Sequence, residues 1–387
     1  MALQLSSRHP HNRCRLRQDA PGRVMAKNCR FHPLTPPRSP MQTSAFRSIE
    51  APPLAAIQQT ELWQRLYGRY TDFCTQIDIA EQFCAWARNR ADGEQLLLQA
   101  KADSTYVFIG DTHGEFDTLL AIICHVCSTA NNKRPHFVLL GDCIDRGRKD
   151  LAILALVEEA LMQQTPAEFD LSYLCGNHDL ALDVLPGGFF YSAVTPADTA
   201  NKLNCLSKQG RAANALCLGK AAIELARTAP YIGELLGVLP NEPDSAFIFA
   251  HACPPHTDNQ AQLEALYPQR PISSPFAALP EHLLYPCRDD CLRALLRTEA
   301  PSTPPSRGFA ATRQGIADIE AYFSLHQRLT GHRVAGMFRG HDHVTHGYHI
   351  HHCHNSFICT LNALGLQATT AAALQTDGDI CLLHFCR

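Results

Sequence analysis

Three short apolar runs, each ending abruptly in Gly-Asp or Gly-Asn, constrain the fold of this chain more than any other feature. They are YVFIGDTHG at 106–114, FVLLGDCIDRG at 137–147 and YLCGNHD at 173–179. Each run has the length and the continuous hydrophobicity of a strand that is buried on both faces. A segment with a helical pattern, 117–130, separates the first two runs. This alternation predicts an α/β protein.

Polar side chains follow each run at the point where the strand ends. Asp111 and His113 follow the first run, Asp142 the second and Asn177 the third. Open α/β sheets bind ligands at the carboxyl ends of their strands, so we expect these side chains to line one edge of the sheet. Carboxylate oxygens and imidazole nitrogens there can bind a metal ion. Asn177 is an unusual residue at a strand end unless its carbonyl oxygen has something to bind.

Two later motifs supply further histidines after strand-like segments. His251 ends the run AFIFAH, and His341 and His343 lie in RGHDHV. Taken singly, each motif has a structural explanation, such as an Asp that caps the next helix or a Gly-Asp turn with a surface salt bridge. Five such motifs in this order favour a metal site instead.

In their order and combination, the five motifs resemble those of the calcineurin-like metallophosphoesterase superfamily. The resemblance rests on GD-x-HG, GD-x-x-DRG, GNH followed by an acid, a lone His after a strand, and RGH-x-H, and it covers about residues 105–365. The DRG form is similar to the phosphoprotein phosphatase branch, of the bacterial serine/threonine phosphatase type. The resemblance implies a four-layer α/β/β/α sandwich. The Gly-Pro-rich loop LPGGFF and the amphipathic segment around 198–228, which lie outside the resemblance, indicate an inserted helical cap.

The resemblance also implies which residues bind two metal ions. The implied ligands are Asp111 and His113 for one ion, Asp142 as the bridge, and Asn177, His251 and His341 for the other. Other branches of the superfamily have a second histidine in the last motif and use it on the first metal. His343 is therefore a further candidate ligand.

The same comparison implies the remaining catalytic roles. His178 is expected to protonate the leaving alcohol, with Asp145 as the acid that orients it. Arg146 is expected to bind the phosphate. A second arginine does the same in the family; Arg307 matches it best, and Arg313 is the runner-up.

The expected activity is hydrolysis of a phosphate monoester by a water molecule that two metal ions activate. Manganese is the expected metal, with iron or zinc as alternatives, because all three suit mixed oxygen and imidazole ligands. The expected substrate is a phosphorylated protein or a small phosphoester. The Asp179 of GNHD resembles the branch that cleaves dinucleoside polyphosphates, so a diadenosine tetraphosphate hydrolase is the alternative. A catalytically silent binding protein on the same fold is the alternative of another class.

We expect three parts along the chain. Residues 1–50 read as a disordered basic leader or an Arg-rich targeting peptide, 51–103 as a helical extension and 104–387 as the catalytic domain. Within that domain, 180–240 are expected to form the cap. The apolar spacing of the extension predicts helices with a break near Asp78.

Composition narrows the possible partners. Residues 1–50 carry nine Lys or Arg and two Asp or Glu, which leaves 25 basic and 35 acidic residues in the rest of the chain. Such an acidic body disfavours a nucleic-acid partner. The 17 cysteines lack zinc-finger spacing and are expected to be reduced thiols in a cytoplasmic protein. No apolar run approaches the roughly 20 residues that span a bilayer, so no membrane partner is expected.

A second group of histidines follows the last motif. Its members are His346, His349, His351, His352 and His354. The alternation in YHIHHCH favours a strand with exposed imidazoles over a second metal site.

Overall fold

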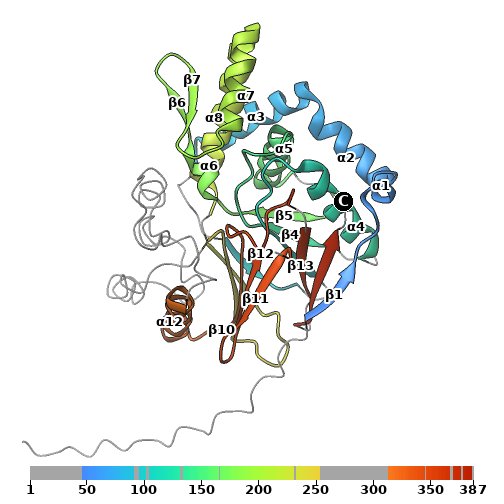
Figure 1. The fold of residues 1–387 in the computed structure, drawn as a ribbon, viewed down its shortest axis with the longest axis vertical. Coiled ribbons are helices and arrows are strands. Elements are labelled where there is room, and N and C mark those ends of the chain that lie inside the picture. Colours follow the sequence, from blue (N-terminus) through green and yellow to red (C-terminus); the bar gives the residue numbers. More distant parts are fainter. Residues whose placement is uncertain are drawn as a thin grey trace, which may run out of the picture. The chain divides into compact units, whose positions relative to one another are not determined.

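The chain forms two six-stranded sheets with helices around them (Figure 1). The structure is a computed structural model. It describes residues 46–90, 96–101, 104–130, 134–164, 166–230, 232–252, 313–344, 346–366, 369–375 and 378–385. Most of the predicted leader, residues 1–45, and residues 253–312, which include Arg307, lie outside the described residues.

The first sheet contains the first two apolar runs as adjacent parallel strands, and the next parallel strand ends at Tyr173, where the third run begins. In spatial order its strands are β1 (Phe46–Glu50), β14 (Ile380–Phe385), β13 (Thr369–Gln375), β3 (Thr105–Ile109), β4 (His136–Leu139) and β5 (Asp170–Tyr173). Because β3, β4 and β5 are parallel, the Gly-Asp and Gly-Asn sequences that follow them meet at one edge of the sheet. Residues 46–50, assigned to the leader from the sequence, pair with β14 as an edge strand.

The second sheet brings the two later histidine motifs to neighbouring strand ends. In spatial order its strands are β11 (Tyr348–His352), β12 (Phe357–Leu361), β10 (Arg333–Arg339), β9 (Ser245–Ala250), β8 (Ile232–Leu236) and β2 (Leu96–Gln99). The parallel strands β9 and β10 pair Ala250 with Arg339. His251 and His341 follow these two residues and so lie at the same edge.

Side chains alternate along β3 between two hydrophobic layers, as the two-residue period of a strand requires. Val107 and Ile109 pack against the helices, whereas Tyr106 and Phe108 pack between the two sheets. A third apolar cluster joins the outer face of the second sheet to α12 (Arg313–Thr330). Three cores between four layers confirm the predicted α/β/β/α sandwich.

The helices on the first sheet come from the N-terminal extension, the catalytic motifs and the insertion. They are α1 (Leu54–Ile57), α2 (Glu61–Thr71), α3 (Phe73–Ala87), α4 (Phe116–Thr129), α5 (Asp150–Leu161) and α8 (Ala212–Thr228). The break in the extension was expected near Asp78, but it falls at Asp72. The side chain of Asp72 accepts a hydrogen bond of 2.8 Å from the backbone N–H of Thr75 and so caps α3.

The segment predicted as a helical cap contains strands as well as helices. The short helix α6 (Asn177–Ala181) leads into a hairpin of β6 (Leu182–Leu185) and β7 (Phe189–Ser192). Gly187 and Gly188 form its turn with φ of 100° and 86°, which favours glycine. The helix α7 (Asp198–Leu206) continues through residues 207–211 into α8. The last part of the predicted segment, β8, belongs to the second sheet.

Candidate metal centre

The strand-end loops hold the candidate ligands in a backbone conformation that side-chain-bearing residues rarely adopt. His113, Asp142 and His341 have φ of 40°, 51° and 67°. Non-glycine residues at positive φ cost free energy and cluster at functional sites. The tight turns explain why glycine precedes Asn177 and His341: a Cβ on Gly176 would lie 2.1 Å from Oδ1 of Asp142. A Cβ on Gly340 would lie 2.4 Å from Oδ1 of Asp111.

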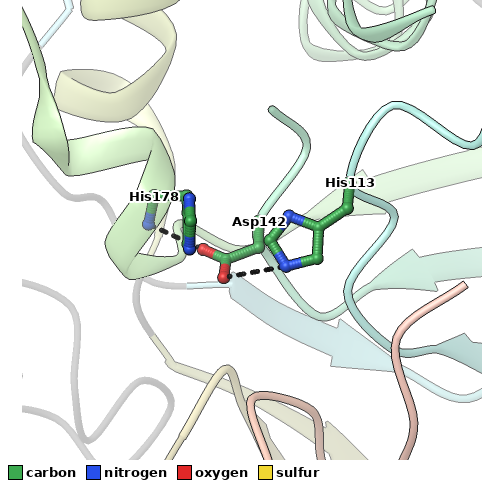
Figure 2. Close-up of side chains that lie close together, drawn as sticks. All are labelled: His113, Asp142 and His178. Carbon is green, nitrogen blue, oxygen red and sulfur yellow. Dashed lines mark hydrogen bonds and ion pairs between the residues drawn. The ribbon is translucent and has the colours of Figure 1, made fainter. Parts of the chain in front are cut away.

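Asp142 is at the centre of the cluster (Figure 2). Its Oδ2 lies 3.6 Å from Nε2 of His113 and 3.5 Å from Nε2 of His251. Its Oδ1 accepts a 2.8 Å hydrogen bond from the backbone N–H of His178. One carboxylate thus lies between two imidazole groups that come from different sheets.

The other predicted ligands surround this carboxylate. Oδ2 of Asp111 lies 3.8 Å from Nε2 of His113. Nε2 of His251 lies 3.1 Å from Oδ1 of Asn177 and 3.1 Å from Nδ1 of His341. The structure therefore brings all six side chains together: Asp111, His113, Asp142, Asn177, His251 and His341.

Backbone carbonyl groups fix the orientation of two of the imidazoles. Nδ1 of His113 donates to the carbonyl oxygen of Ile144 at 2.8 Å, and Nδ1 of His251 donates to that of Leu140 at 2.7 Å. Each ring then directs Nε2 toward Asp142, the arrangement expected of metal-binding histidines. Within the part of the chain that the structure describes, the buried Nε2 of His113 has no hydrogen-bond partner. Burial lowers the pKa of His113, which favours the neutral imidazole that a metal requires.

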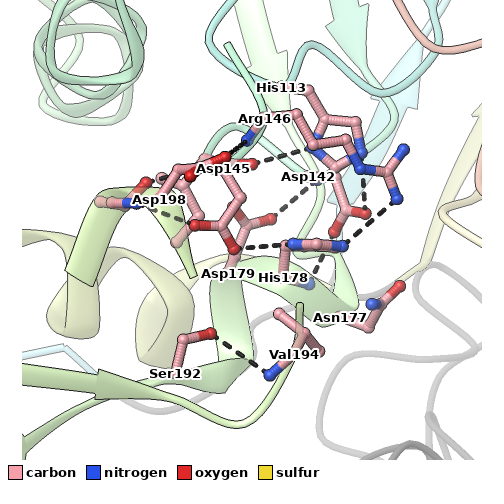
Figure 3. A network of polar contacts seen from close by, with 12 residues as sticks. His113, Asp142, Asp145, Arg146, Asn177, His178, Asp179, Ser192, Val194 and Asp198 are labelled. Carbon is pink, nitrogen blue, oxygen red and sulfur yellow. Dashed lines mark hydrogen bonds and ion pairs between the residues drawn. The ribbon is translucent and has the colours of Figure 1, made fainter. Parts of the chain in front are cut away.

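A buried histidine and aspartate lie beside this cluster (Figure 3). Nδ1 of His178 donates to Oδ2 of Asp145 at 2.7 Å, and both side chains are at most 4% exposed. Burial alone would lower the pKa of His178, but the charge of Asp142 and the hydrogen bond to Asp145 outweigh it and raise the pKa. A raised pKa favours the protonated form of a histidine, which can donate a proton near neutral pH.

Arg146 is an exposed residue that contacts two histidines of the predicted site. Its guanidinium Nη1 is 3.3 Å from Nε2 of His343, and Nη2 is 3.5 Å from Nε2 of His178. His343 contacts this exposed arginine and is in neither group of converging ligand atoms at the centre, which are formed by His113, Asp142 and His178 and by Asp142, His251 and His341. Arg313 begins α12, and its side chain is outside the described residues, as is all of Arg307.

Sequence reasoning missed the contacts that the insertion makes with the site. The backbone N–H of Thr199 donates to Oδ1 of Asp145 at 3.0 Å, and its hydroxyl accepts from the N–H of Asp145 at 3.0 Å. Asp198 accepts from the backbone N–H of Arg146 at 3.1 Å. The only local signal is an Asp-Thr pair at a helix start, which usually indicates capping.

A second unforeseen contact joins two of the strand-end loops. Oδ2 of Asp179 accepts hydrogen bonds of 2.8 Å from the N–H groups of Asp142 and Gly176, and Oδ1 accepts one of 2.9 Å from Cys143. Asp179 therefore binds the backbone of the loop that carries Asp142. The acid after GNH is visible in the sequence, but its three partners are not.

Comparison with known proteins defines the class. The model of the calcineurin-like phosphoesterase family matches residues 104–345, and the chain belongs to this family. It is a hydrolase, a phosphatase that cleaves phosphate esters, of a family that uses a dinuclear metal centre. The predicted family and enzyme class are confirmed. No curated protein matches the chain.

The chain is also similar to solved structures, at low identity. One is a protein serine/threonine phosphatase from Saccharomyces cerevisiae with similarity to human phosphatase PP5, at 14% identity, TM-score 0.46, and coverage of 86% of this chain and 95% of that one. Another is a cold-active protein-tyrosine phosphatase of a psychrophilic Shewanella species, at 18% identity, TM-score 0.42, and coverage of 74% and 82%. In the described part of the chain, no helix is long and apolar enough to cross a membrane.

Proposed function

We propose that this chain is a serine/threonine phosphoprotein phosphatase-like phosphomonoesterase. The proposal rests on one observation above all: Asp142 lies between two sets of imidazole nitrogens, with the buried His178–Asp145 pair directly beside it. A cation-binding cluster next to a histidine whose pKa is raised is suited to bind a phosphate and to protonate the oxygen that leaves.

Asp111 and His113 would hold one metal ion, and Asn177, His251 and His341 the other, with Asp142 between them. The positions of the two Nε2 atoms around Oδ2 of Asp142 support this division. When bound, the two ions would act as Lewis acids toward the phosphoryl oxygens and lower the pKa of a bound water. We propose manganese, with iron or zinc as alternatives, because oxygen and imidazole ligands suit all three. His343 is a proposed further ligand that would have to leave Arg146.

The chain's own groups would perform the rest of the reaction. His178 would give its proton to the leaving oxygen, while Asp145 keeps Nδ1 protonated and the ring fixed. Arg146 would bind non-bridging phosphate oxygens through its two terminal nitrogens. A second arginine, Arg307 or else Arg313, would share that role. Asp198 supports this assignment of Arg146, because it anchors the arginine's backbone.

The alternative substrate class is a dinucleoside polyphosphate such as diadenosine tetraphosphate. Asp179 favours it on the sequence, since GNHD is the form of that branch. In the structure, this carboxylate faces three backbone N–H groups. Asp179 therefore supports the loop that carries Asp142, a role that does not depend on the substrate. For this reason we keep a phosphorylated protein or a small phosphoester as the leading substrate. A silent binding protein would hold the metals without turnover.

A comparison of three substrates tests the proposal. Phosphate release from p-nitrophenyl phosphate, a phosphothreonine peptide and diadenosine tetraphosphate would be measured with Mn²⁺ and after chelation, beside Asp142→Asn and His178→Ala. The proposal predicts Mn²⁺-dependent turnover of the phosphopeptide that both variants lose. Preference for the dinucleotide would establish the alternative, and no turnover by metal-loaded protein would establish a binding function.

We also propose a reducing, cytoplasmic location. The buried cysteines Cys124, Cys143 and Cys359 form no disulfide bond. Free thiols persist where glutathione and thioredoxin keep them reduced. Thiol titration of the protein freshly isolated from its cells would contradict this if the cysteines were mostly paired as disulfides.

A further inference from the structure

The second histidine group forms a strand whose two faces differ. Tyr348 and Ile350 of β11 pack between the two sheets, and the ring of His352 lies 6.1 Å from that of Phe46. Residues on the alternate positions point to the opposite face. There, Cys353 packs against the apolar cluster beneath α12, and His351 is two residues before it. The strand was predicted, but His351 is half-buried and faces a helix.

Three potential ligand atoms converge at this face. Glu320 on α12, His351 on β11 and Cys353 just beyond it place a carboxylate oxygen, an imidazole nitrogen and a thiol sulfur within 4.8 Å of one another. Ligands of a tetrahedral zinc ion lie roughly 3.5 Å apart, given bonds of about 2.0–2.3 Å. Shifts of about 1 Å or less would therefore bring these atoms around one ion.

The backbone around Cys353 is already fixed. Its N–H donates to the carbonyl oxygen of Ser356 at 2.9 Å, which closes the turn between β11 and β12. His351 is held by the pairing of β11 with β12, opposite Ile358. Two of the three groups thus come from a rigid hairpin and the third from a helix that packs against it, which is the type of support that metal sites require.

We propose that Glu320, His351 and Cys353 bind one zinc ion, distinct from the dinuclear centre. A thiolate together with an imidazole and a carboxylate suits Zn²⁺, whereas Mn²⁺ prefers oxygen ligands. Three protein ligands leave a fourth position for water or another group. The ion would fasten α12 to the edge strand of the second sheet.

A reactive cysteine is the competing interpretation of the same residues. Cys353 packs against the apolar cluster beneath α12, and its nearest charged partner in this group is the carboxylate of Glu320. Nucleophilic and redox-active cysteines have lowered pKa values and lie near cations. The surroundings of Cys353 therefore disfavour that role.

Cobalt substitution tests the proposal without relying on activity. Co²⁺ bound by a thiolate shows a sulfur-to-metal charge-transfer band in the near ultraviolet, and none of the proposed ligands of the dinuclear centre is a cysteine. The full chain would first be loaded with Mn²⁺ and then titrated with Co²⁺, and competition with Zn²⁺ would follow. We expect the band to saturate at one Co²⁺ per chain and Zn²⁺ to abolish it.

Variants assign the band to these residues. Cys353→Ser should remove it, and Glu320→Gln and His351→Ala should weaken Co²⁺ binding by about 100-fold or more, since even an outer partner of a ligand contributes 10–100-fold. The matched controls are Cys205→Ser and His349→Ala, both at exposed positions. If the wild-type protein gives no band, or if the band survives in folded Cys353→Ser or in His351→Ala, the proposal is overturned.

Discussion

Nδ1 of His178 lies 2.7 Å from Oδ2 of Asp145, and both groups are buried beside the carboxylate of Asp142. The other oxygen of Asp145 accepts from the backbone of Thr199, so the carboxylate cannot turn away from the imidazole. The relationship fixes the ring and leaves Nε2 facing Arg146 at 3.5 Å. This geometry is what the proposed role of His178 as proton donor requires.

His178→Ala should lower kcat by about 10²–10⁴-fold on a phosphothreonine peptide, the usual contribution of a positioned acid. The loss should be much smaller on p-nitrophenyl phosphate, because p-nitrophenolate leaves without a proton. Asp145→Asn should show the same dependence on the leaving group, and the double variant should be little worse than either single variant. Equal losses on both substrates would contradict a role in leaving-group protonation.

Thr199→Val tests the contact between the insertion and Asp145, the partner of His178. Valine keeps the shape but removes the hydroxyl, which accepts from the N–H of Asp145 and donates to Asp150 at 2.5 Å. The buried N–H left unpaired should cost about 1–3 kcal/mol in free energy of unfolding. Urea unfolding measures this loss, and kcat should fall as Asp145 loses its anchor. Thr199→Ser keeps the hydroxyl and should resemble the wild type in both measurements; a fully active and stable valine variant would disprove the anchoring.

Asp179→Asn should weaken metal binding without removing a ligand. The substitution would replace one of the two carboxylate oxygens, which together accept from three backbone N–H groups, by an NH2 group. At least one of these backbone N–H groups would then face the NH2 group, which is also a donor. Loss of such an outer partner typically lowers metal affinity by about 10–100-fold. Mn²⁺ activation curves measure this, and Asp183→Asn on the exposed side of β6 is the control. Identical curves for wild type and Asp179→Asn would show that metal binding does not depend on the hydrogen bonds of Asp179.

Glu158 makes the stability of the protein dependent on pH. It is 2% exposed, and burial raises its pKa from 4.5 to about 8. Two titratable thiols lie near Glu158: Cys84 on α3 and Cys217 on α8. The charged groups near Cys84 are Glu224 and Arg88, and those near Cys217 are Glu81 and Lys220. Below about pH 4.5 Glu158 is protonated in both the folded and the unfolded chain, so it does not make the free energy of unfolding depend on pH there. Between pH 4.5 and 8 only the unfolded chain releases this proton. The free energy of unfolding therefore falls as the pH rises.

Glu158→Gln should therefore be stabilising at high pH. The gain in free energy of unfolding should be small near pH 5 and grow to at most about 4 kcal/mol near pH 8. Thermal melts at the two pH values measure the difference, with exposed Glu81→Gln as the control for a change of charge alone. A gain that is the same at both pH values would show that Glu158 is not protonated in the folded chain.

The sequence was sufficient for the parts of the fold that carry continuous apolar runs. β3 and β4 are buried on both faces along most of their length, and most of their residues are apolar for that reason. The residues of β5 are DLSY, so the predicted run overlaps this strand only at Tyr173. The edge strand β1 was missed because FRSIE is mostly exposed and lacks such a pattern. The helix break was placed at the wrong aspartate, since Asp72 and Asp78 both suit a cap and tertiary packing selects between them.

The candidate ligands were predictable because each directly follows a strand, so local order places it at the edge. The contacts of Asp145 with Thr199 and of Asp142 with Asp179 join residues 54 and 37 positions apart. No local pattern encodes such pairs, because they depend on how the insertion and the loops pack. The chemical groups were thus visible in the sequence, whereas the contacts that orient them needed the structure.

Electron paramagnetic resonance of the Mn²⁺-loaded chain tests the central claim, that Asp142 joins two metal sites, most directly. Two manganese ions that share a carboxylate couple magnetically and give a multiline dinuclear spectrum. We predict this spectrum at two Mn²⁺ per chain for the wild type, and its loss or conversion to an isolated Mn²⁺ signal in Asp142→Asn. A wild-type protein that binds only isolated Mn²⁺, or a dinuclear spectrum unchanged in Asp142→Asn, would contradict the claim.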